Sequence, residues 1–308
     1  MTPTALRVAC IGEAMIELSG HDPLAGTIRL GVAGDVFNTA VYLKRLLGDR
    51  AEVAFLSAVG RDPFSRHMEH VMEEEGLDAS LLARLDRRLP GIYAISLDER
   101  GERSFHYWRS ESAARAMLEP GGLDLDRAGR FDLVYFSGIT LAILPAPART
   151  RLLRWCAEIR AAGGRVAFDS NYRPHLWDSR EAARAAFAAA WAVAGIALPS
   201  RDDEARLHPG EEPPDLFARL SRCGVSEVAL KDGGRGPILW DGCALPPGEW
   251  PAAERVVDTT AAGDGFNAGY LAARLLGRTV PEAATAGHDL ARRIVMHPGA
   301  IIPRQDGR

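Results

Sequence analysis

The feature that most constrains the fold of this 308-residue chain is its regular alternation of strand-like and helix-like segments. Short apolar runs between turn residues are typical of strands, and longer segments with apolar residues every three to four positions are typical of helices. Two parallel strands need a long crossover connection, which is usually a helix. The alternation therefore predicts an α/β fold, with a mostly parallel central sheet and helices on both of its faces.

The same pattern and the capping residues set the boundaries of the predicted elements. Strands are predicted at Arg7–Leu18, Val53–Val59, Leu133–Ser137, Val166–Asp169, Ile196–Pro199 and Val228–Lys231. Helices are predicted at Asp35–Leu47, from Asp62-Pro63 to Gly76, and at Ala146–Ala162, Arg180–Ala194, Gly263–Leu276 and Pro281–His297. Asp before Pro is a typical helix start, and Gly just after a helical pattern is a typical stop. The stretch Leu207–Pro214, rich in Pro and Glu, is predicted to be a loop.

One stretch does not fit the alternation. Gly91–Asp98 and Glu102–Arg109 are both strand-like, and the residues between them have the length and the glycine of a three-residue hairpin loop. A hairpin is antiparallel, so this pair is expected to leave the main sheet. In that register Tyr93 lies opposite Tyr107, and strand alternation puts Arg109 on the same face. A lid over a binding site and a plain surface hairpin both fit this pattern. We expect a single domain over residues 1–308, with a small β lid formed by segments near 11–34 and 90–110.

Charge and cysteine usage argue against several classes of protein. The formal net charge is −4, so there is no overall basic excess to hold a nucleic-acid backbone. The four cysteines form no C-x-x-C pair, which disfavours a zinc site, and free thiols suit a reducing compartment. The sequence shows neither a signal-peptide pattern nor an apolar run of about 18 residues. We expect a cytoplasmic protein without nucleic-acid or membrane partners.

The usual phosphate-binding motifs are absent, but one turn has the chemistry they use. There is no G-x-x-x-x-G-K-[ST] sequence and no G-x-G-x-x-G after the first strand. The run Ala261-Ala262-Gly263-Asp264-Gly265 instead places small residues at the start of a predicted helix. Amide groups at a helix start can hold a phosphate, and a carboxylate among them can accept a hydroxyl proton. From these residues alone, Asp264 is either a catalytic base or a helix cap.

Two motifs carry a resemblance to a known family. The run Asp258-Thr-Thr-Ala-Ala-Gly-Asp264 resembles the D-T-x-G-A-G-D signature of the ribokinase (PfkB) family of carbohydrate kinases. Gly31-Val-Ala-Gly-Asp-Val-Phe-Asn38 is similar to the family's first, Gly-rich signature. The resemblance implies a ribokinase-like fold in which the hairpin is the β lid. It also implies that Asp264 is the catalytic base, that the amides of Ala261, Ala262 and Gly263 form an anion hole, and that Gly34 and Asn38 contact the sugar.

The resemblance also implies a nucleotide side of the site, with ATP and Mg²⁺ as cofactors. Lys231-Asp-Gly-Gly-Arg-Gly236 is similar to the family's nucleotide loop, with Gly233 and Gly236 at its usual glycine positions. His288 lies where relatives place an Asn near adenine. The family's N-x-x-E element is replaced by Ser200-Arg-Asp-Asp203, so we name no metal ligand. The ion is expected to arrive with ATP and to keep several waters.

Within the family, the closest resemblance is to 2-keto-3-deoxygluconate kinases. Gly91-Ile-Tyr93, Phe105-His-Tyr-Trp-Arg109, Phe136-Ser-Gly-Ile139 and Phe168-Asp-Ser-Asn-Tyr-Arg-Pro-His-Leu-Trp177 carry it. By this resemblance Tyr93, Tyr107, Arg109 and Arg173 contact a sugar acid. Independently, Arg binds carboxylates with paired hydrogen bonds, and a neutral sugar does not require two cations. Arg173 could alternatively bind ATP phosphates.

Other functions remain open at this point. The nearest alternative is a kinase for fructose or another neutral sugar, and a more distant one is a non-catalytic sugar or nucleotide sensor on the same fold. The intact Asp264 turn argues against the sensor. The resemblance also implies that two copies can pair through their lids as a homodimer.

Overall fold

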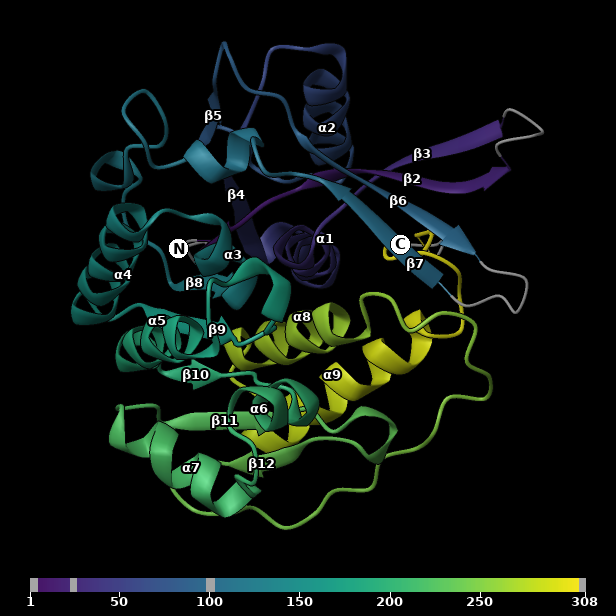
Figure 1. Ribbon diagram of the computed structural model, residues 1–308. Coiled ribbons are helices and arrows are strands. Elements are labelled where there is room, and N and C mark those ends of the chain that lie inside the picture. The colour runs from purple at the N-terminus through teal and green to yellow at the C-terminus, as the bar shows by residue number, and fades with distance from the viewer. Residues whose placement is uncertain (1–4, 23–26, 98–102, 305–308) are drawn as a thin grey trace.

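The computed structural model describes residues 5–22, 27–97 and 103–304 (Figure 1). Within these residues the main sheet has eight strands in the order β12-β11-β10-β9-β8-β1-β4-β5. Neighbouring strands are parallel except β11 and β12. The strands are β1 (Leu6–Ile11), β4 (Ala51–Val59), β5 (Leu82–Arg84), β8 (Leu133–Ser137), β9 (Arg165–Asp169), β10 (Ile196–Ala197), β11 (Glu227–Leu230) and β12 (Ile238–Trp240). The predicted α/β class is confirmed.

Helices cover both faces of the main sheet, and a buried apolar cluster lies under each layer (Figure 1). One layer is formed by α1 (Asp35–Leu47), α2 (Pro63–Glu74), α8 (Ala262–Leu275) and α9 (Val280–Ile294). The other is formed by α3 (Gly138–Ile143), α4 (Ala146–Ala161), α5 (Arg180–Val193), α6 (Arg201–Leu207) and α7 (Pro213–Arg222). Successive residues of a strand point to opposite faces of the sheet, so in β1 Val8 belongs to one cluster and Ala9 to the other. Strands buried on both faces need near-continuous apolar runs.

A second sheet of four strands leaves the main body, in the order β3-β2-β6-β7. Its strands are β2 (Met15–Asp22), β3 (Thr27–Ala33), β6 (Gly91–Leu97) and β7 (Arg103–Trp108). Strands β6 and β7 are antiparallel, and Tyr93 lies opposite Tyr107 as the hairpin register predicts. The predicted turn Glu99-Arg100-Gly101 lies outside the described residues. Strand β2 pairs with β6 in parallel, which joins two segments more than seventy residues apart.

Several predicted boundaries were wrong. The predicted strand Arg7–Leu18 is two strands in different sheets, because Gly12–Ala14 interrupts it. A Cβ at Gly12 would lie 2.7 Å from Cβ of Val36, so the chain turns where α1 packs closely. The loop prediction for Leu207–Pro214 missed that α6 ends and α7 begins within it. The seven residues of α6 show too little periodicity to be recognised in sequence, and α7 was missed because its first residues, Pro213 and Pro214, were interpreted as loop residues.

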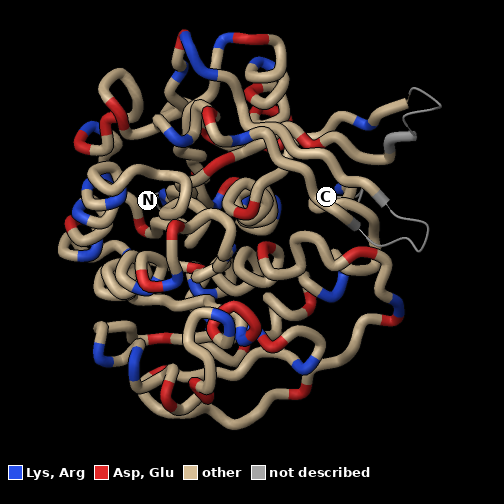
Figure 2. Tube along the Cα trace, viewed as in Figure 1, with Lys and Arg blue, Asp and Glu red and all other residues tan. Residues whose placement is uncertain are grey.

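Charged residues of both signs are interspersed along the described part of the chain (Figure 2). Among the described residues, none of the helices has the length and apolar character needed to cross a membrane.

The start of α3 generates a prediction about stability. A Cβ at Gly138 would overlap the carbonyl oxygen of Ser170 and come within 2.5 Å of the Phe187 ring. We expect Gly138→Ala to lower the free energy of unfolding by about 1–3 kcal/mol, the usual cost of overpacking a core. Urea denaturation measures this change. Gly234→Ala is the control, because a Cβ there meets nothing within 4 Å. Equal stability of the two variants would contradict the packing at α3.

Candidate active site

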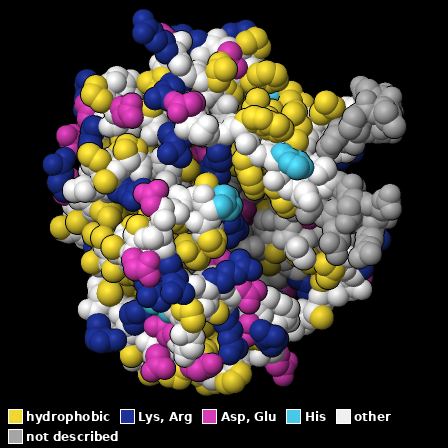
Figure 3. Space-filling model, in the orientation of Figure 1, with side chains coloured by type: hydrophobic (Ala, Val, Ile, Leu, Met, Phe, Trp, Pro, Cys, Tyr) yellow, Lys and Arg dark blue, Asp and Glu magenta, His cyan; other side chains and the backbone are white. Residues whose placement is uncertain are grey.

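A pocket of about 1370 Å³ lies between the second sheet and the carboxyl ends of the main-sheet strands. The space-filling view shows the surface hollowed between these two parts (Figure 3). Carboxyl ends of strands are where open α/β sheets bind ligands. All the site residues predicted from sequence line this one pocket: Gly34, Asn38, Tyr93, Tyr107, Arg109, Arg173, Lys231, Gly233, Gly236, Ala261, Ala262, Gly263, Asp264 and His288.

The amino end of α8 forms the floor of the pocket. Ala261 precedes the helix with a φ of 60°, a left-handed conformation that is uncommon outside glycine. This turn starts the helix abruptly, so the amides of its first turn have no partner within the helix, and the Ala262 amide donates to the Thr259 carbonyl at 3.3 Å. They carry partial positive charge toward the pocket. A Cβ at Gly263 would lie 3.7 Å from Nζ of Lys231, so an ammonium group stands beside these amides.

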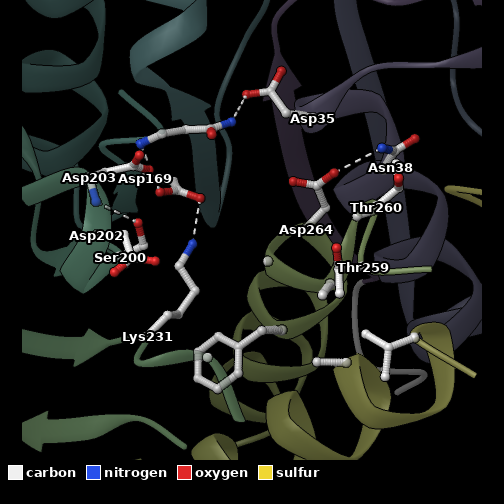
Figure 4. A pocket seen from close by; sticks show the side chains of 18 of the residues that line it. Asp35, Asn38, Asp169, Ser200, Asp202, Asp203, Lys231, Thr259, Thr260 and Asp264 are labelled. Atoms are coloured by element: carbon white, nitrogen blue, oxygen red, sulfur yellow. Dashed lines mark hydrogen bonds and ion pairs between the residues drawn. The ribbon is translucent and has the colours of Figure 1, made fainter. Parts of the chain in front are cut away.

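Asp264 lies in the first turn of α8 and is held by α1 (Figure 4). Nδ2 of Asn38 donates to its Oδ2 at 2.8 Å, and the Gly34 amide donates to Oδ1 of Asn38 at 3.3 Å. The pKa of Asp264 is raised to about 8, chiefly by burial and next by the neighbouring charge of Asp35. The hydrogen bond from Asn38 and the charge of Lys231 oppose that rise. Asp264 is thus a carboxyl group that accepts and releases a proton near neutral pH.

Gly34 is needed for this arrangement because of a close backbone contact. A Cβ at Gly34 would overlap the carbonyl oxygen of Glu13. The turn between β3 and α1 therefore passes against the turn between β1 and β2. The Gly34 amide orients the side chain of Asn38, one helical turn later, by a hydrogen bond, and Asn38 in turn donates a hydrogen bond to Asp264.

Lys231 is part of a buried network that sequence analysis did not find (Figure 4). Its Nζ lies 2.6 Å from Oδ2 of Asp169 and 3.1 Å from Oδ1 of Asn267. Asn267 also donates to Asp169 at 2.7 Å and to the Tyr135 hydroxyl at 3.0 Å. The network joins the ends of β9 and β11 to α8. The sequence does show a polar residue at the end of each strand, Asp169 and Lys231. The contact of Asp169 with Asn267, 98 residues later, forms only in the tertiary structure.

The second sheet contributes the aromatic and cationic side of the pocket. The rings of Tyr93 and Tyr107 are 5.8 Å apart, and Tyr107 stacks on His175 of the main body at 6.2 Å. The Tyr93 hydroxyl donates to Glu17. Arg109 is only 8% exposed and forms an ion pair with Glu13. Sequence analysis proposed the two tyrosines and the arginine but missed His175 and both glutamates.

Arg173 also has an acidic partner. Its Nη1 lies 3.5 Å from Oδ1 of Asp203, and the same nitrogen donates to the Tyr172 carbonyl at 3.0 Å. Burial raises the pKa of Asp203, while Arg173 lowers it. The side chain of Arg173 remains 41% exposed. A bridge to a neighbouring acid and a contact with a ligand are therefore compatible at this position.

The described residues contain no cluster of three or more acidic, His or Cys side chains arranged to hold a metal. Asp202 and Asp203 do line the pocket, in the first turn of α6. The carboxylate of Asp169 is already paired with the ammonium group of Lys231. Two adjacent carboxylates supply few oxygen ligands, a donor set that suits a divalent cation which keeps several of its waters.

The remaining wall combines a glycine loop with the ring of His288, and the ring of Trp250 packs against both from outside the pocket lining. Gly233 and Gly236 have φ values of 55° and 80°, so both need the freedom of glycine. A Cβ at Gly236 would overlap the ring of Trp250, which lies 5.4 Å from the His288 ring. Nε2 of His288 lies 2.8 Å from the Pro251 carbonyl oxygen. A flat apolar ligand fits such a wall.

Comparison with known proteins agrees with this arrangement. The description "pfkB family carbohydrate kinase" matches residues 5–306. The chain is 41% identical over 305 residues to the 2-dehydro-3-deoxygluconokinase of Escherichia coli (strain K12), covering 97% of this chain and 98% of the relative. It is 44% identical over 309 residues to the 2-dehydro-3-deoxygluconokinase of Dickeya dadantii, covering 97% and 98%. A fructokinase from Salmonella typhimurium is 29% identical over 282 residues, covering 91% and 88%.

Solved structures show the same fold. A PfkB protein from Polaromonas sp. JS666 superposes with a TM-score of 0.82 at 28% identity, covering 95% of this chain and 96% of that one. The aminoimidazole riboside kinase from Salmonella enterica, complexed with aminoimidazole riboside and an ATP analog, gives 0.80 at 25% identity, covering 96% and 95%. With the family description matching nearly the whole chain, this protein belongs to the pfkB family of carbohydrate kinases.

Proposed function

We propose that this carbohydrate kinase transfers the γ-phosphoryl group of ATP to a primary hydroxyl of 2-keto-3-deoxygluconate, the sugar acid also called 2-dehydro-3-deoxygluconate. The observation that carries the proposal is Asp264, a carboxyl group with a pKa of about 8 at the amino end of a helix inside the pocket. The names of the relatives that are 41–44% identical support the choice of sugar.

In the proposed mechanism Asp264 accepts the proton of the sugar hydroxyl as that oxygen bonds to the γ-phosphorus, and the bond from the γ-phosphorus to the bridging oxygen breaks to release ADP. Asn38 holds the carboxylate in place through its 2.8 Å hydrogen bond. The amides of Ala261, Ala262 and Gly263 stabilise the negative charge on the transferring group. Lys231 adds a positive charge beside them, with Gly233, Gly236 and His288 on the nucleotide side. Mg²⁺ bound with the nucleotide supplies charge neutralisation of its phosphates.

We further propose that the second sheet acts as a lid. Tyr107 already stacks on His175 across the pocket, so the sheet and the main body touch above the site. A lid that excludes water reduces hydrolysis of ATP. Tyr93, Tyr107 and Arg109 are its proposed sugar-acid contacts, and Arg173 is the contact from the main body, or alternatively a phosphate contact.

One observation favours the alternative, a kinase for fructose or another neutral sugar. Arg109 and Arg173 each have a carboxylate partner, Glu13 and Asp203, so neither is an uncompensated charge awaiting an acid. Against it, the named fructokinase is less similar, at 29% identity, than the sugar-acid kinases. A guanidinium group has five N–H donors, so one carboxylate partner still leaves donors for a second.

The outer face of the second sheet supports a proposed homodimer. By strand alternation Leu30 and Trp108 lie on the face opposite Tyr93 and Tyr107, and they are 42% and 60% exposed. Figure 3 shows hydrophobic side chains gathered over this sheet. The same uncharged patch on two copies can meet across a twofold axis.

The role of Asp264 predicts a loss of turnover without loss of folding. We expect Asp264→Asn to lower kcat by about 10²- to 10⁴-fold, the usual contribution of a general base. Because the base must be deprotonated to act, kcat/KM of the unaltered enzyme should rise as pH increases toward about 8 and then level off. Steady-state assays coupled to ADP release, run across pH, measure both effects.

Asp215→Asn on α7 is the control for this experiment, since Asp215 is exposed and does not line the pocket. Turnover of Asp264→Asn within tenfold of the unaltered enzyme would refute the assignment. Complete absence of sugar-dependent ADP release from the unaltered protein would favour the non-catalytic sensor.

The substrate assignment predicts a charge-dependent selectivity. We expect turnover of 2-keto-3-deoxygluconate to exceed that of fructose and ribose. Arg109→Ala should raise KM for the acid by roughly 10- to 100-fold, the value of a charge-assisted hydrogen bond, and leave the neutral sugars unchanged. Arg154→Ala, on the far helix α4, is the control. Preference for fructose, or an equal effect of Arg109→Ala on all three sugars, would favour the neutral-sugar kinase.

The dimer predicts that one added charge separates the subunits. We expect Trp108→Glu to convert a dimeric mass to a monomeric one in size-exclusion chromatography with light scattering, because a charge cannot be buried unpaired. Leu276→Glu, an exposed apolar residue at the end of α8, should leave the mass unchanged. A monomeric mass for the unaltered protein at micromolar concentration rules out the interface.

A further inference from the structure

The chain passes between the main sheet and the second sheet at four places, and these four connections come together around Glu13. Glu13 belongs to the three-residue connection from β1 to β2 and is only 2% exposed. Its carboxylate accepts hydrogen bonds from the guanidinium of Arg109 and the hydroxyl of Ser112. Both donors lie just after β7, where the chain returns from the second sheet.

The other two connections press against the same residue. A Cβ at Gly34, between β3 and α1, would overlap the carbonyl oxygen of Glu13. A Cβ at Gly91, where β6 begins, would lie 2.8 Å from Oε1 of Glu13 and 3.3 Å from Cβ of Arg109. Glycine at position 34 makes room for the backbone of Glu13, and glycine at position 91 makes room for its carboxylate.

Arg109 lines the pocket, and its surroundings restrict the orientation of its guanidinium group. It is only 8% exposed, and its Nε is buried without a hydrogen-bond partner. A buried donor left unsatisfied is unfavourable, so the guanidinium is held in this orientation by its other contacts and not by a bond at Nε. The Tyr107 ring, 5.9 Å away, covers the guanidinium group. With Glu13 on one nitrogen and an aromatic ring nearby, the orientation of the planar group is restricted.

We infer that Glu13 is a positioning residue, which orients the guanidinium of Arg109 at the base of the second sheet and thereby determines how tightly the kinase binds the carboxylate of its substrate. The inference rests on the proposed function, because it takes the substrate to be a sugar acid. The side chain of Glu13 acts through Arg109 and not on the reacting hydroxyl, since its carboxylate bonds Arg109 and Ser112, whereas the base is bonded to Asn38.

A double-mutant cycle tests the inference. Glu13→Ala should raise both KM for 2-keto-3-deoxygluconate and the Kd measured by calorimetry without ATP by at least about tenfold, with kcat changed less than threefold. Glu13→Gln, which keeps an acceptor for Arg109, should stay within about threefold of the unaltered enzyme. Adding Glu13→Ala to Arg109→Ala should change KM no further, because the positioned group is already gone.

Glu17→Ala is the matched control, because Glu17 is bonded to Tyr93 on the same sheet and not to Arg109. Its effect should add to that of Arg109→Ala. Thermal denaturation checks that every variant is folded, and the binding measurement needs no turnover. Suppose that the unaltered enzyme binds and phosphorylates the acid. If Glu13→Ala then leaves KM and Kd for the acid unchanged, or if its effect on KM adds to that of Arg109→Ala, the inference is wrong and the proposed function stands. If the unaltered enzyme does not bind the acid, both fall.

Discussion

The site depends on one buried ion pair, between Lys231 and Asp169. The two charged groups are 2.6 Å apart, and their side chains are 12% and 4% exposed. Buried charges are tolerated only when they are paired and hydrogen-bonded, and removing one partner usually costs about 3–5 kcal/mol. Asn267 completes the pairing with bonds to both groups. The ends of two strands and the first turns of α8 are therefore held in one relative position.

This pair also sets the electrostatics of the pocket. Lys231 lowers the pKa of Asp264, but its charge is shared with Asp169, which itself raises that pKa. Burial and the charge of Asp35 also raise the pKa of Asp264. The balance leaves Asp264 with a pKa of about 8 at the amino end of α8. A fully exposed aspartate would be a much weaker base, with a pKa near 4.

The opposite wall is organised in a similar way around a different buried carboxylate. Glu13 pairs with Arg109 where the second sheet leaves the main body, as Asp169 pairs with Lys231 at the end of the main sheet. In each case the cation lines the pocket and the acid restricts its orientation. Pairing lowers the cost of burying a cation near a ligand, and it replaces a mobile charge by one held in place.

The sequence by itself determined the class of fold and, through its signature motifs, part of the lining of the pocket. Strand and helix periods are local, so the alternation, the helix Asp35–Leu47 and the pairing of Tyr93 with Tyr107 could be predicted from neighbouring residues. The signature turn around Asp264 is a contiguous motif and could be recognised directly. Only the tertiary structure decided the partners, such as Glu13 for Arg109 and Asp169 for Lys231. These pairs join residues 96 and 62 positions apart, and no local pattern encodes which of many acidic residues a folded chain brings to a given cation.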